Sequence, residues 1–294
     1  MLTLTRRPKW LNKKIDLRDC YDMKKFLAGM GLNTVCQQAS CPNISECFGK
    51  GAATFLLLGK NCTRNCSFCN VESLAPFPVD NQEPERVNEA VRRLGLKHVV
   101  ITSVTRDDLY DGGAGQFAKT IELIKLEQPA VTIEVLVPDF KGYRELVGIV
   151  VEEMPDIFGH NIETVPRIYK LVRPQADYIR SLKVLEAAKS KAADKKVFTK
   201  SGIMLGLGEK EEEVLTVFRD LRNSGCDFLS IGQYLAPSKR HFAVCDFIEP
   251  EKFVYYKQKA LDIGFIHVES GPYVRSSYNA GEYLKNKVIK GVLI

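Results

Sequence analysis

The sequence predicts an α/β fold, in which parallel strands alternate with helices to form part of a barrel. Apolar runs of strand length recur along the 294 residues, and segments of helical character separate them. Such alternation indicates parallel pairing, because each crossover helix returns the chain to the same end of the sheet. Right-handed crossovers curl the sheet. We therefore expect a partial (β/α)6 barrel of the TIM type, with extensions at both ends of the chain.

The first predicted strand is Ala53–Leu58, a continuous apolar run that ends at Gly59 and is typical of a strand buried on both faces. The other predicted strands are His98–Ser103, Val131–Val137, Asp156–Ile162, Phe198–Leu205 and Asp227–Leu235. Helices are predicted over Asp19–Met30, Pro84–Leu94, Tyr143–Val151, Tyr178–Ala193, Glu209–Asn223 and Pro250–Ile263. A further helix is predicted to follow Gly112–Gly115 and to end at Glu127. The expected division is an N-terminal arm (1–50), the barrel (51–265) and a C-terminal extension (266–294).

Composition and charge exclude several classes of protein. Hydrophobic residues make up 45% and charged residues 27%, as in ordinary globular proteins. We find no apolar run of membrane-spanning length and no basic–aromatic array, so neither a membrane span nor nucleic-acid binding is expected. The basic start, MLTLTRRPKWLNKKI, lacks the apolar segment of a secretory signal. A cytoplasmic protein with reduced thiols is expected, and a short organelle presequence is the alternative.

Two cysteine triplets are the strongest chemical signal. They are Cys36-x4-Cys41-x5-Cys47 and Cys62-x3-Cys66-x2-Cys69, and they hold six of the nine cysteines. Three thiolates on one short loop can ligate three irons of a cubane 4Fe–4S cluster, which leaves the fourth iron open to an amine and a carboxylate. Structural zinc is the alternative, but zinc prefers four nitrogen or sulfur ligands. For the first triplet, the sequence alone leaves a fourth ligand open among Cys20, Cys226 and Cys245.

Polar residues follow several predicted strands. Chemistry in barrels of this type is located at the carboxyl ends of the strands, so side chains there are expected to share one mouth with the second triplet. They are Thr102, Ser103, Asn161, Glu163, the Gly206–Glu209 turn and Tyr234.

The second triplet, with Phe68 before its last cysteine, resembles the radical S-adenosylmethionine (SAM) superfamily. The resemblance implies that the open iron binds the amine and carboxylate of SAM, and that one-electron reduction cleaves SAM to a 5′-deoxyadenosyl radical. It implies that Phe68 and the backbone from Gly202 to Gly206 hold the adenine. Further expected contacts, to ribose or to the methionine group and its carboxylate, come from Thr102, Ser103, Asn161, Glu163, Arg173, Lys200 and Tyr234.

Both triplets together resemble the lipoyl synthase family. The resemblance extends over nearly the whole chain and includes the motifs VITSVTRDDLYDGGA, HNIET, KSGIMLGLGE, IGQYLAPS and GPYVRSSYNAGEY. It implies insertion of two sulfurs, at carbon 6 and carbon 8 of an octanoyl chain on a carrier-protein lysine. It also implies two 4Fe–4S clusters. The first triplet and Ser277, with Ser276 as the second choice, would hold the auxiliary cluster that donates the sulfur.

The implied partners are octanoylated lipoyl carrier domains or the glycine cleavage H protein, and a reduced ferredoxin or flavodoxin as electron donor. A monomer is expected. The formal charge of +6 suggests a basic rim for an acidic carrier, with Lys239, Arg240 and Arg275 as candidates. Two alternatives stand beside this reading: another radical SAM enzyme that inserts sulfur or transfers a methylthio group, and a non-catalytic iron–sulfur or zinc scaffold.

Overall fold

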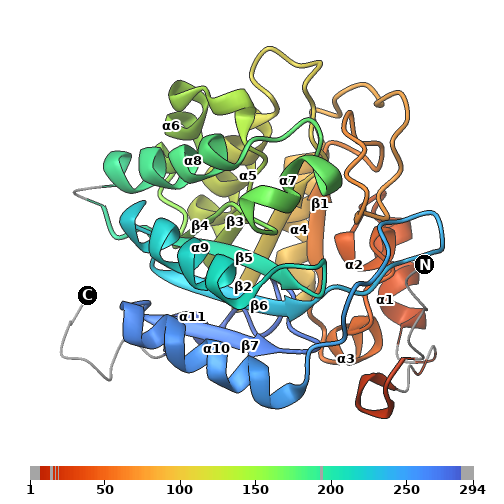
Figure 1. Ribbon diagram of the computed structural model, residues 1–294. Helices are drawn as coiled ribbons and strands as arrows, with labels where there is room; N and C mark the ends of the chain where they lie inside the picture. Colours follow the sequence, from red (N-terminus) through yellow and green to blue (C-terminus); the bar gives the residue numbers. More distant parts are fainter. Residues whose placement is uncertain (1–6, 14–15, 17, 19, 193–194, 286–294) are drawn as a thin grey trace.

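The computed structural model describes residues 7–13, 16, 18, 20–192 and 195–285. Its centre is a seven-stranded parallel sheet in which the strands follow one another in chain order (Figure 1). The strands are β1 (Thr54–Leu57), β2 (His98–Ser103), β3 (Thr132–Leu136), β4 (Ile157–Gly159), β5 (Phe198–Leu205), β6 (Phe228–Gln233) and β7 (His267–Gly271). Within the described residues β7 does not pair with β1, so the barrel is open on one side.

The predicted partial α/β barrel is confirmed. Each of the six predicted strands occurs, and β7 extends the sheet beyond the expected barrel boundary by pairing with β6. The sequence His267-Val-Glu-Ser-Gly271 contains only one aliphatic residue, Val268, which explains why the apolar pattern did not reveal this strand.

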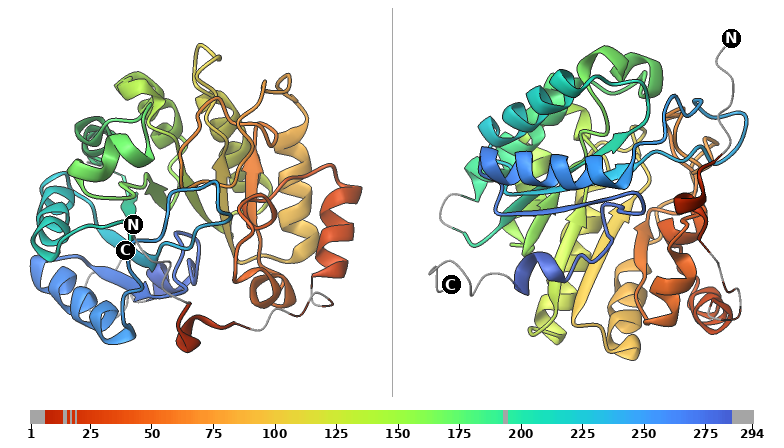
Figure 2. Two further views of the ribbon diagram at one scale, coloured as in Figure 1. Left: turned by 45° about the vertical axis from the view of Figure 1, so that its right-hand side comes forward. Right: turned by 60° about the horizontal axis from the view of Figure 1, so that its bottom comes forward.

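Helices cover the outer face of the sheet in an arc (Figures 1 and 2). They are α4 (Glu83–Leu94), α5 (Ala114–Glu127), α6 (Arg144–Glu152), α8 (Tyr178–Lys191), α9 (Glu211–Asn223) and α10 (Pro250–Ile263). Each of these helices contacts the next, and their apolar faces pack on strands that are almost completely buried. The short helix α7 (Pro166–Val172) was not predicted, because seven residues are too few to show a helical period.

The N-terminal arm packs beside β1. It contains α1 (Tyr21–Gly29), α2 (Val35–Gln38) and α3 (Ile44–Gly49), after a short 3-10 turn, η1 (Lys9–Leu11). Thr34 forms an antiparallel bridge with Phe55, and the Leu56 amide donates to the Asn33 carbonyl oxygen at 2.9 Å. These bonds place the first cysteine triplet next to the strand that leads to the second. Asp19 and Ala193, the predicted ends of two helices, lie outside the described residues.

The chain after β7 turns back toward the amino ends of the strands and leads into α11 (Glu282–Lys285). Tyr283 of α11 is buried against Ile157 and Phe228, at the end of the barrel opposite the cysteine loop. A second 3-10 turn, η2 (Phe140–Gly142), follows β3. In the described part of the chain, every helix is too short or too polar to span a bilayer.

Candidate iron–sulfur and cofactor site

The second cysteine triplet lies on the loop that follows β1. The backbone takes left-handed conformations at Leu58 and Gly59 (φ 67° and 87°), which turn the chain sharply into this loop. The two ends of the loop are joined, because Asn61 bridges Glu72 and the Cys62 amide donates to the Glu72 carbonyl oxygen at 2.8 Å. The loop therefore presents Cys62, Cys66 and Cys69 on one short, closed segment.

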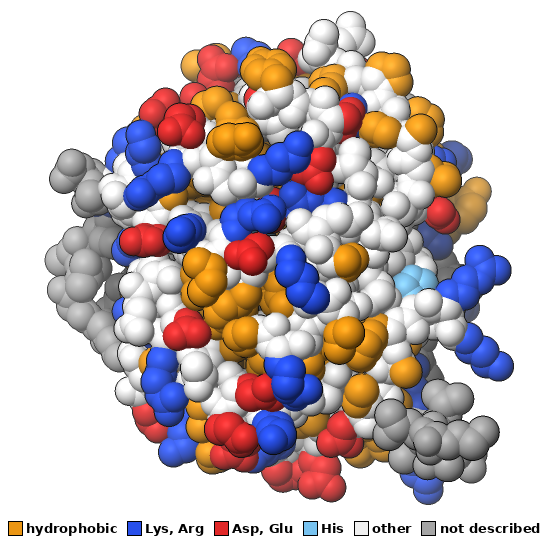
Figure 3. Space-filling model, turned by 45° about the horizontal axis from the view of Figure 1, so that its top comes forward, with side chains coloured by type: hydrophobic (Ala, Val, Ile, Leu, Met, Phe, Trp, Pro, Cys, Tyr) orange, Lys and Arg blue, Asp and Glu red, His pale blue; other side chains and the backbone are white. Residues whose placement is uncertain are grey.

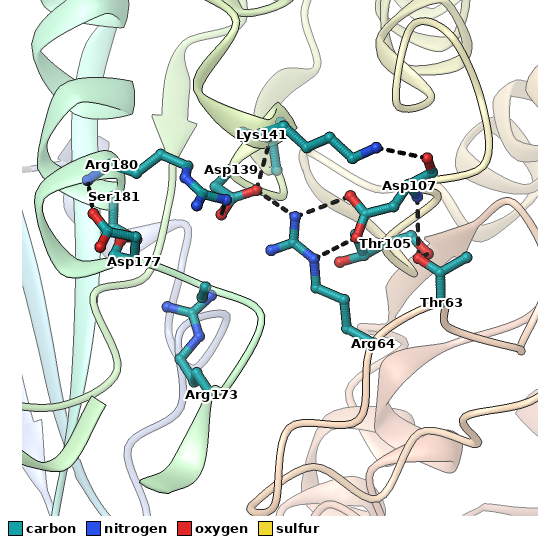
Figure 4. Close-up of polar contacts among 12 residues, drawn as sticks. Thr63, Arg64, Thr105, Asp107, Asp139, Lys141, Arg173, Asp177, Arg180 and Ser181 are labelled. Atoms are coloured by element: carbon teal, nitrogen blue, oxygen red, sulfur yellow. Dashed lines mark hydrogen bonds and ion pairs between the residues drawn. The ribbon is translucent and has the colours of Figure 1, made fainter. Parts of the chain in front are cut away.

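Arg64, inside this triplet, anchors the loop to the barrel (Figure 4). Its guanidinium donates to Asp107 at 2.7 and 2.9 Å and to Asp139 at 2.7 Å, and Arg180 donates to the other Asp139 oxygen at 3.2 Å. The Asp139 carboxylate is fully buried. Burial alone would raise its pKa, but the hydrogen bond and charge of Arg64 outweigh burial and hold the pKa at about 2. Asp139 is therefore ionised and fixes the arginine.

Three of the predicted SAM contacts meet beside Cys66. Burial raises the pKa of the Cys66 thiol, while the nearby Arg173 guanidinium lowers it and the Glu163 carboxylate raises it. Arg173 donates to the Asn161 carbonyl oxygen at 3.1 Å, and the Asn161 amide donates to Glu163 at 3.1 Å. Glu163 has a left-handed backbone (φ 69°), a conformation that costs energy and concentrates at functional sites.

Several buried polar atoms near the carboxyl ends of the strands have no hydrogen-bond partner among the described residues. They are Ser103 Oγ, His160 Nε2, Thr164 Oγ1 and Arg173 Nε. Such atoms are costly unless a ligand or water satisfies them. A ligand that carries an amine, a carboxylate and hydroxyls, as SAM does, fits this set of donors and acceptors.

The remaining predicted cofactor contacts fall into two groups. Phe68, Gly202, Gly206 and Tyr234 line the side of the barrel formed by β5 and β6, and Phe68 packs partly buried against that core. Phe242 joins this side to the cysteine loop, since its amide donates to Ser67 and its carbonyl oxygen accepts from Tyr234.

Two predicted contacts are engaged elsewhere. Thr102 donates its hydroxyl to the Leu136 carbonyl oxygen at 2.8 Å. Lys200 lies near the amino end of β5, where its ammonium group donates to Glu134 at 2.8 and 3.1 Å. The structure therefore does not bring Lys200 to the cysteine loop.

The first triplet is distributed over α2, the following turn and α3. Burial raises the pKa of Cys36 to about 12, and the neighbouring Cys41 and Cys47 thiols add to the rise. Burial, the Cys41 thiol and the Glu46 carboxylate raise the pKa of Cys47 to about 11. The three thiols are thus close enough to interact. The Asn70 amide donates to Gln38 and Ser40 at 2.9 and 3.2 Å, and so ties this segment to the second triplet.

The C-terminal turn lies against the first triplet. The Asn43 amide donates to the Tyr273 carbonyl oxygen at 2.7 Å, and the Tyr278 hydroxyl donates to Glu46 at 3.3 Å. The Arg275 guanidinium is close enough to Cys41 for the two charges to interact. Of the two serines between these contacts, Ser276 accepts a hydrogen bond from the Asn161 side chain at 2.7 Å.

Among the described residues, no three His, Cys, Asp or Glu side chains are close enough to share one metal ion. In a 4Fe–4S cluster each thiolate ligates a different iron, so its ligands need not meet at one ion.

Sequence reasoning missed the roles of Arg64 and Asp139. Arg64 was detectable, because it lies between two cysteines, but its partner Asp139 is 75 positions away. His160 is 1% exposed, and its Nδ1 is bonded to the Val137 carbonyl oxygen at 2.9 Å. Burial and Arg173 lower its pKa to about 4, so it is neutral near pH 7.

Replacing Gly206 by alanine is expected to cost at least about 2 kcal/mol of unfolding free energy. Gly206 has φ +97°, and an added Cβ would lie 2.3 Å from Gln233 Nε2 and 2.4 Å from the Asp246 carbonyl oxygen. Gly95→Ala is the matched control, since φ there is +60° and the space is open. It should cost about 1 kcal/mol. Urea unfolding measures both values, and an equal loss of unfolding free energy in the two variants would contradict the close packing at Gly206.

Known proteins with similar sequences belong to a superfamily that fits this cysteine loop. The family model of the radical SAM superfamily matches residues 56–221. The lipoyl synthase of Geobacter metallireducens is 58% identical over 282 residues, which cover 96% of this chain and 99% of that protein. The lipoyl synthase of Caldanaerobacter subterraneus subsp. tengcongensis is 58% identical over 276 residues, which cover 94% and 96% of the two chains.

Solved structures with low sequence identity share the fold. Methylornithine synthase has a TM-score of 0.55 at 14% identity, over 73% of this chain and 69% of its own. Streptococcus suis SuiB bound to S-adenosylmethionine has a TM-score of 0.54 at 11% identity, over 84% and 58% of the two chains. The cysteine loop at the end of β1, the superfamily match and the identity over nearly the full length lead to one conclusion: this chain belongs to the lipoyl synthase family of radical SAM enzymes.

Proposed function

We propose that this enzyme inserts sulfur at carbon 6 and carbon 8 of an octanoyl chain carried on a protein lysine, and that two 4Fe–4S clusters divide the work. The observation that carries the proposal is the placement of two cysteine triplets side by side, joined by Asn70 and closed by the C-terminal turn. An enzyme with one cluster would need only the triplet that follows β1.

The substrate explains why a radical is required. Carbons 6 and 8 of a saturated chain carry only C–H bonds, which are not acidic, so a general base cannot activate them. Cys62, Cys66 and Cys69 would hold a 4Fe–4S cluster, and the chemistry supplied by that group when bound and reduced would be one-electron cleavage of SAM to a radical able to abstract hydrogen. Arg64 and Asp139 hold the cysteine loop in place for that step.

SAM is proposed to bind between the cysteine loop and the carboxyl ends of β4–β6. Arg173 would receive its carboxylate, because the guanidinium lies beside Cys66 and its Nε has no partner among the described residues. Asn161 and Glu163 would receive the amine or the ribose hydroxyls. Phe68, the Gly202–Gly206 backbone and Tyr234 would enclose the adenine. Ser103 is a further contact, with its unpartnered hydroxyl.

The auxiliary cluster is proposed on Cys36, Cys41, Cys47 and Ser277. A serine oxygen is a harder and weaker ligand for iron than a thiolate, which suits a cluster that must give up sulfur. Ser277 is preferred to Ser276, since the Ser276 hydroxyl already accepts a hydrogen bond from Asn161.

The proposal is tested by anaerobic reconstitution with iron and sulfide, followed by dithionite, SAM and an octanoyl-lysine peptide. We expect about eight irons per chain, because each cubane holds four. We also expect 5′-deoxyadenosine and a peptide that has gained two sulfurs. Bound zinc or an absence of SAM cleavage would exclude the proposal. SAM cleavage with a methylthio product would favour the alternative radical SAM activity.

The carrier is proposed to be an acidic octanoylated lipoyl domain or glycine cleavage H protein, and the electron donor a reduced ferredoxin or flavodoxin. The enzyme is proposed to act as a monomer in the cytoplasm. In that compartment its nine cysteines, none of them in a disulfide in the structure, would stay reduced. On the face in Figure 3, lysine and arginine side chains are interspersed with acidic and apolar ones. Attraction to the carrier would therefore arise from a few exposed cations such as Lys239 and Arg240.

Charge reversal at Lys239 and Arg240 is expected to weaken carrier binding about tenfold at low salt and to reduce its dependence on ionic strength. The measurement is the dissociation constant of an octanoylated carrier domain over a series of salt concentrations. Reversal of Lys125, on the outer helix α5, is the matched control and should have little effect. A dissociation constant that changes neither with salt nor with charge reversal at Lys239 and Arg240 would show that the carrier binds another surface.

A further inference from the structure

The amino end of the barrel contains a buried ion pair that the proposed reaction does not use. Lys200 on β5 and Glu134 on β3 lie 2.8 Å apart, and each side chain is only 2% exposed. His98 of β2 approaches the same carboxylate at 3.8 Å. Burying two charges costs several kcal/mol of desolvation, and an apolar pair of similar size would be about as stable. The charges are therefore better explained by what they position than by the stability they add.

Tyr283 of the C-terminal segment covers this pair. Its ring centroid lies 3.8 Å from the Lys200 ammonium nitrogen, 4.7 Å from the His267 ring and 5.4 Å from the Phe228 ring. The Tyr283 side chain is 1% exposed. A cation held over a ring face in a desolvated site attracts it by about 2 kcal/mol and requires a defined ring orientation. Lys200 thus specifies where this segment docks.

The docked tyrosine is close in sequence to the turn that meets the first triplet. Tyr283 is six positions after Ser277, so the chain between them spans at most about 20 Å. Ala280 within this stretch is also buried. At the other end, Val274 approaches β6 so closely that a Cβ on Gly232 would lie 2.1 Å from the Val274 carbonyl oxygen. The serine turn is therefore held between two fixed points.

We propose that Lys200, Glu134 and Tyr283 form an anchor that positions the Arg275-Ser276-Ser277 turn against Cys36, Cys41 and Cys47. The inference rests on the proposed function in one respect, the assignment of a turn serine to the auxiliary cluster. Lys200, which the sequence associated with SAM, becomes a positioning residue for the other cluster. Loss of the anchor releases the serine side of that cluster. On the SAM side it removes only the Ser276 partner of Asn161, while Arg64 and Arg173 keep their own contacts.

The test compares Tyr283→Ala with Tyr283→Phe. Phenylalanine keeps the ring over Lys200 and removes the hydroxyl, which donates to the Leu229 carbonyl oxygen at 3.4 Å and bonds to the Glu269 backbone. Tyr256→Ala is the matched control, because Tyr256 is an almost fully buried tyrosine on α10 with no part in the C-terminal turn. It should cost similar packing energy.

Two readouts are needed. The first is hydrogen exchange at the Val274 and Tyr278 amides, which bond to Gly271 and Arg275. It requires no activity, so it tests the anchor even if the proposed reaction fails. The second is iron release from the reconstituted enzyme to a chelator, together with SAM cleavage.

Tyr283→Ala should expose the two amides and speed iron release about tenfold, as loss of a supporting residue typically does. Its SAM cleavage should stay within about twofold of wild type, and Tyr283→Phe should behave as wild type. If Tyr283→Ala does not fold, the double variant Lys200→Met/Glu134→Leu replaces the pair by apolar residues and should give the same two effects. Unchanged exchange in the loosened variants, or the same changes in Tyr256→Ala, would overturn the proposal.

Discussion

Replacing Cys41 by alanine is expected to abolish sulfur insertion, with product falling at least about a hundredfold, while SAM cleavage stays within about threefold of wild type. Cys41 lies between α2 and α3, beside the C-terminal turn and outside the loop that follows β1. Its loss should remove the auxiliary cluster only. The measurement is single-turnover mass spectrometry of an octanoyl-lysine peptide, with 5′-deoxyadenosine determined in the same sample.

Two further cysteine variants complete this comparison. Cys66→Ala should eliminate both 5′-deoxyadenosine and product, because Cys66 lies beside Arg173 and Glu163 at the proposed SAM site. Cys245→Ala is the matched control, since Cys245 packs near Gly208 and belongs to neither triplet. If Cys41→Ala lost SAM cleavage while Cys66→Ala retained it, the roles assigned to the two triplets would be reversed.

Replacing Arg64 by methionine is expected to lower the free energy of unfolding by about 3 kcal/mol, because it leaves the buried Asp139 carboxylate without its main cation. Asp139 is fully buried and would keep only Arg180 at 3.2 Å and the Lys141 amide at 3.0 Å. The cysteine loop would also lose its anchor to β3. Urea unfolding of the apo protein gives the energy, and iron content after reconstitution reports on the loop.

Two variants separate this effect from a simple loss of charge. Arg92→Met removes an exposed arginine paired with Glu89 one helical turn away, and it should cost no more than about 1 kcal/mol. Arg64→Met/Asp139→Asn removes both charges and should recover part of the stability lost in the single variant. A single variant as stable as Arg92→Met would show that Asp139 does not depend on Arg64.

The local chemistry of the site was readable from the sequence. Each cysteine triplet is contained within a dozen residues, and the buried strand before the second triplet has an unmistakable apolar pattern. Asn161 and Glu163 follow β4 directly, so the rule that parallel strands end at one mouth was enough to bring them toward the cysteine loop.

Residue orientation within elements was harder to predict. Lys200 is the third of eight residues in β5 and pairs with Gly159 and Phe228, so it lies near the amino end of the barrel. Its charge suggested a SAM contact, but its position along the strand already opposed that role. The partners of Arg64 and Lys200 are 75 and 66 positions away, and no local pattern reveals such pairs.

The source of the inserted sulfur tests the central claim most directly. The enzyme is reconstituted with heavy-isotope sulfide, freed of excess sulfide, and allowed one turnover with dithionite, unlabelled SAM and an octanoyl-lysine peptide. We predict a product with two heavy sulfur atoms and a loss of iron confined to the first-triplet cluster, absent in Cys41→Ala. A product with unlabelled sulfur, or labelled product formed by Cys41→Ala, would contradict the assignment of that cluster as the sulfur donor.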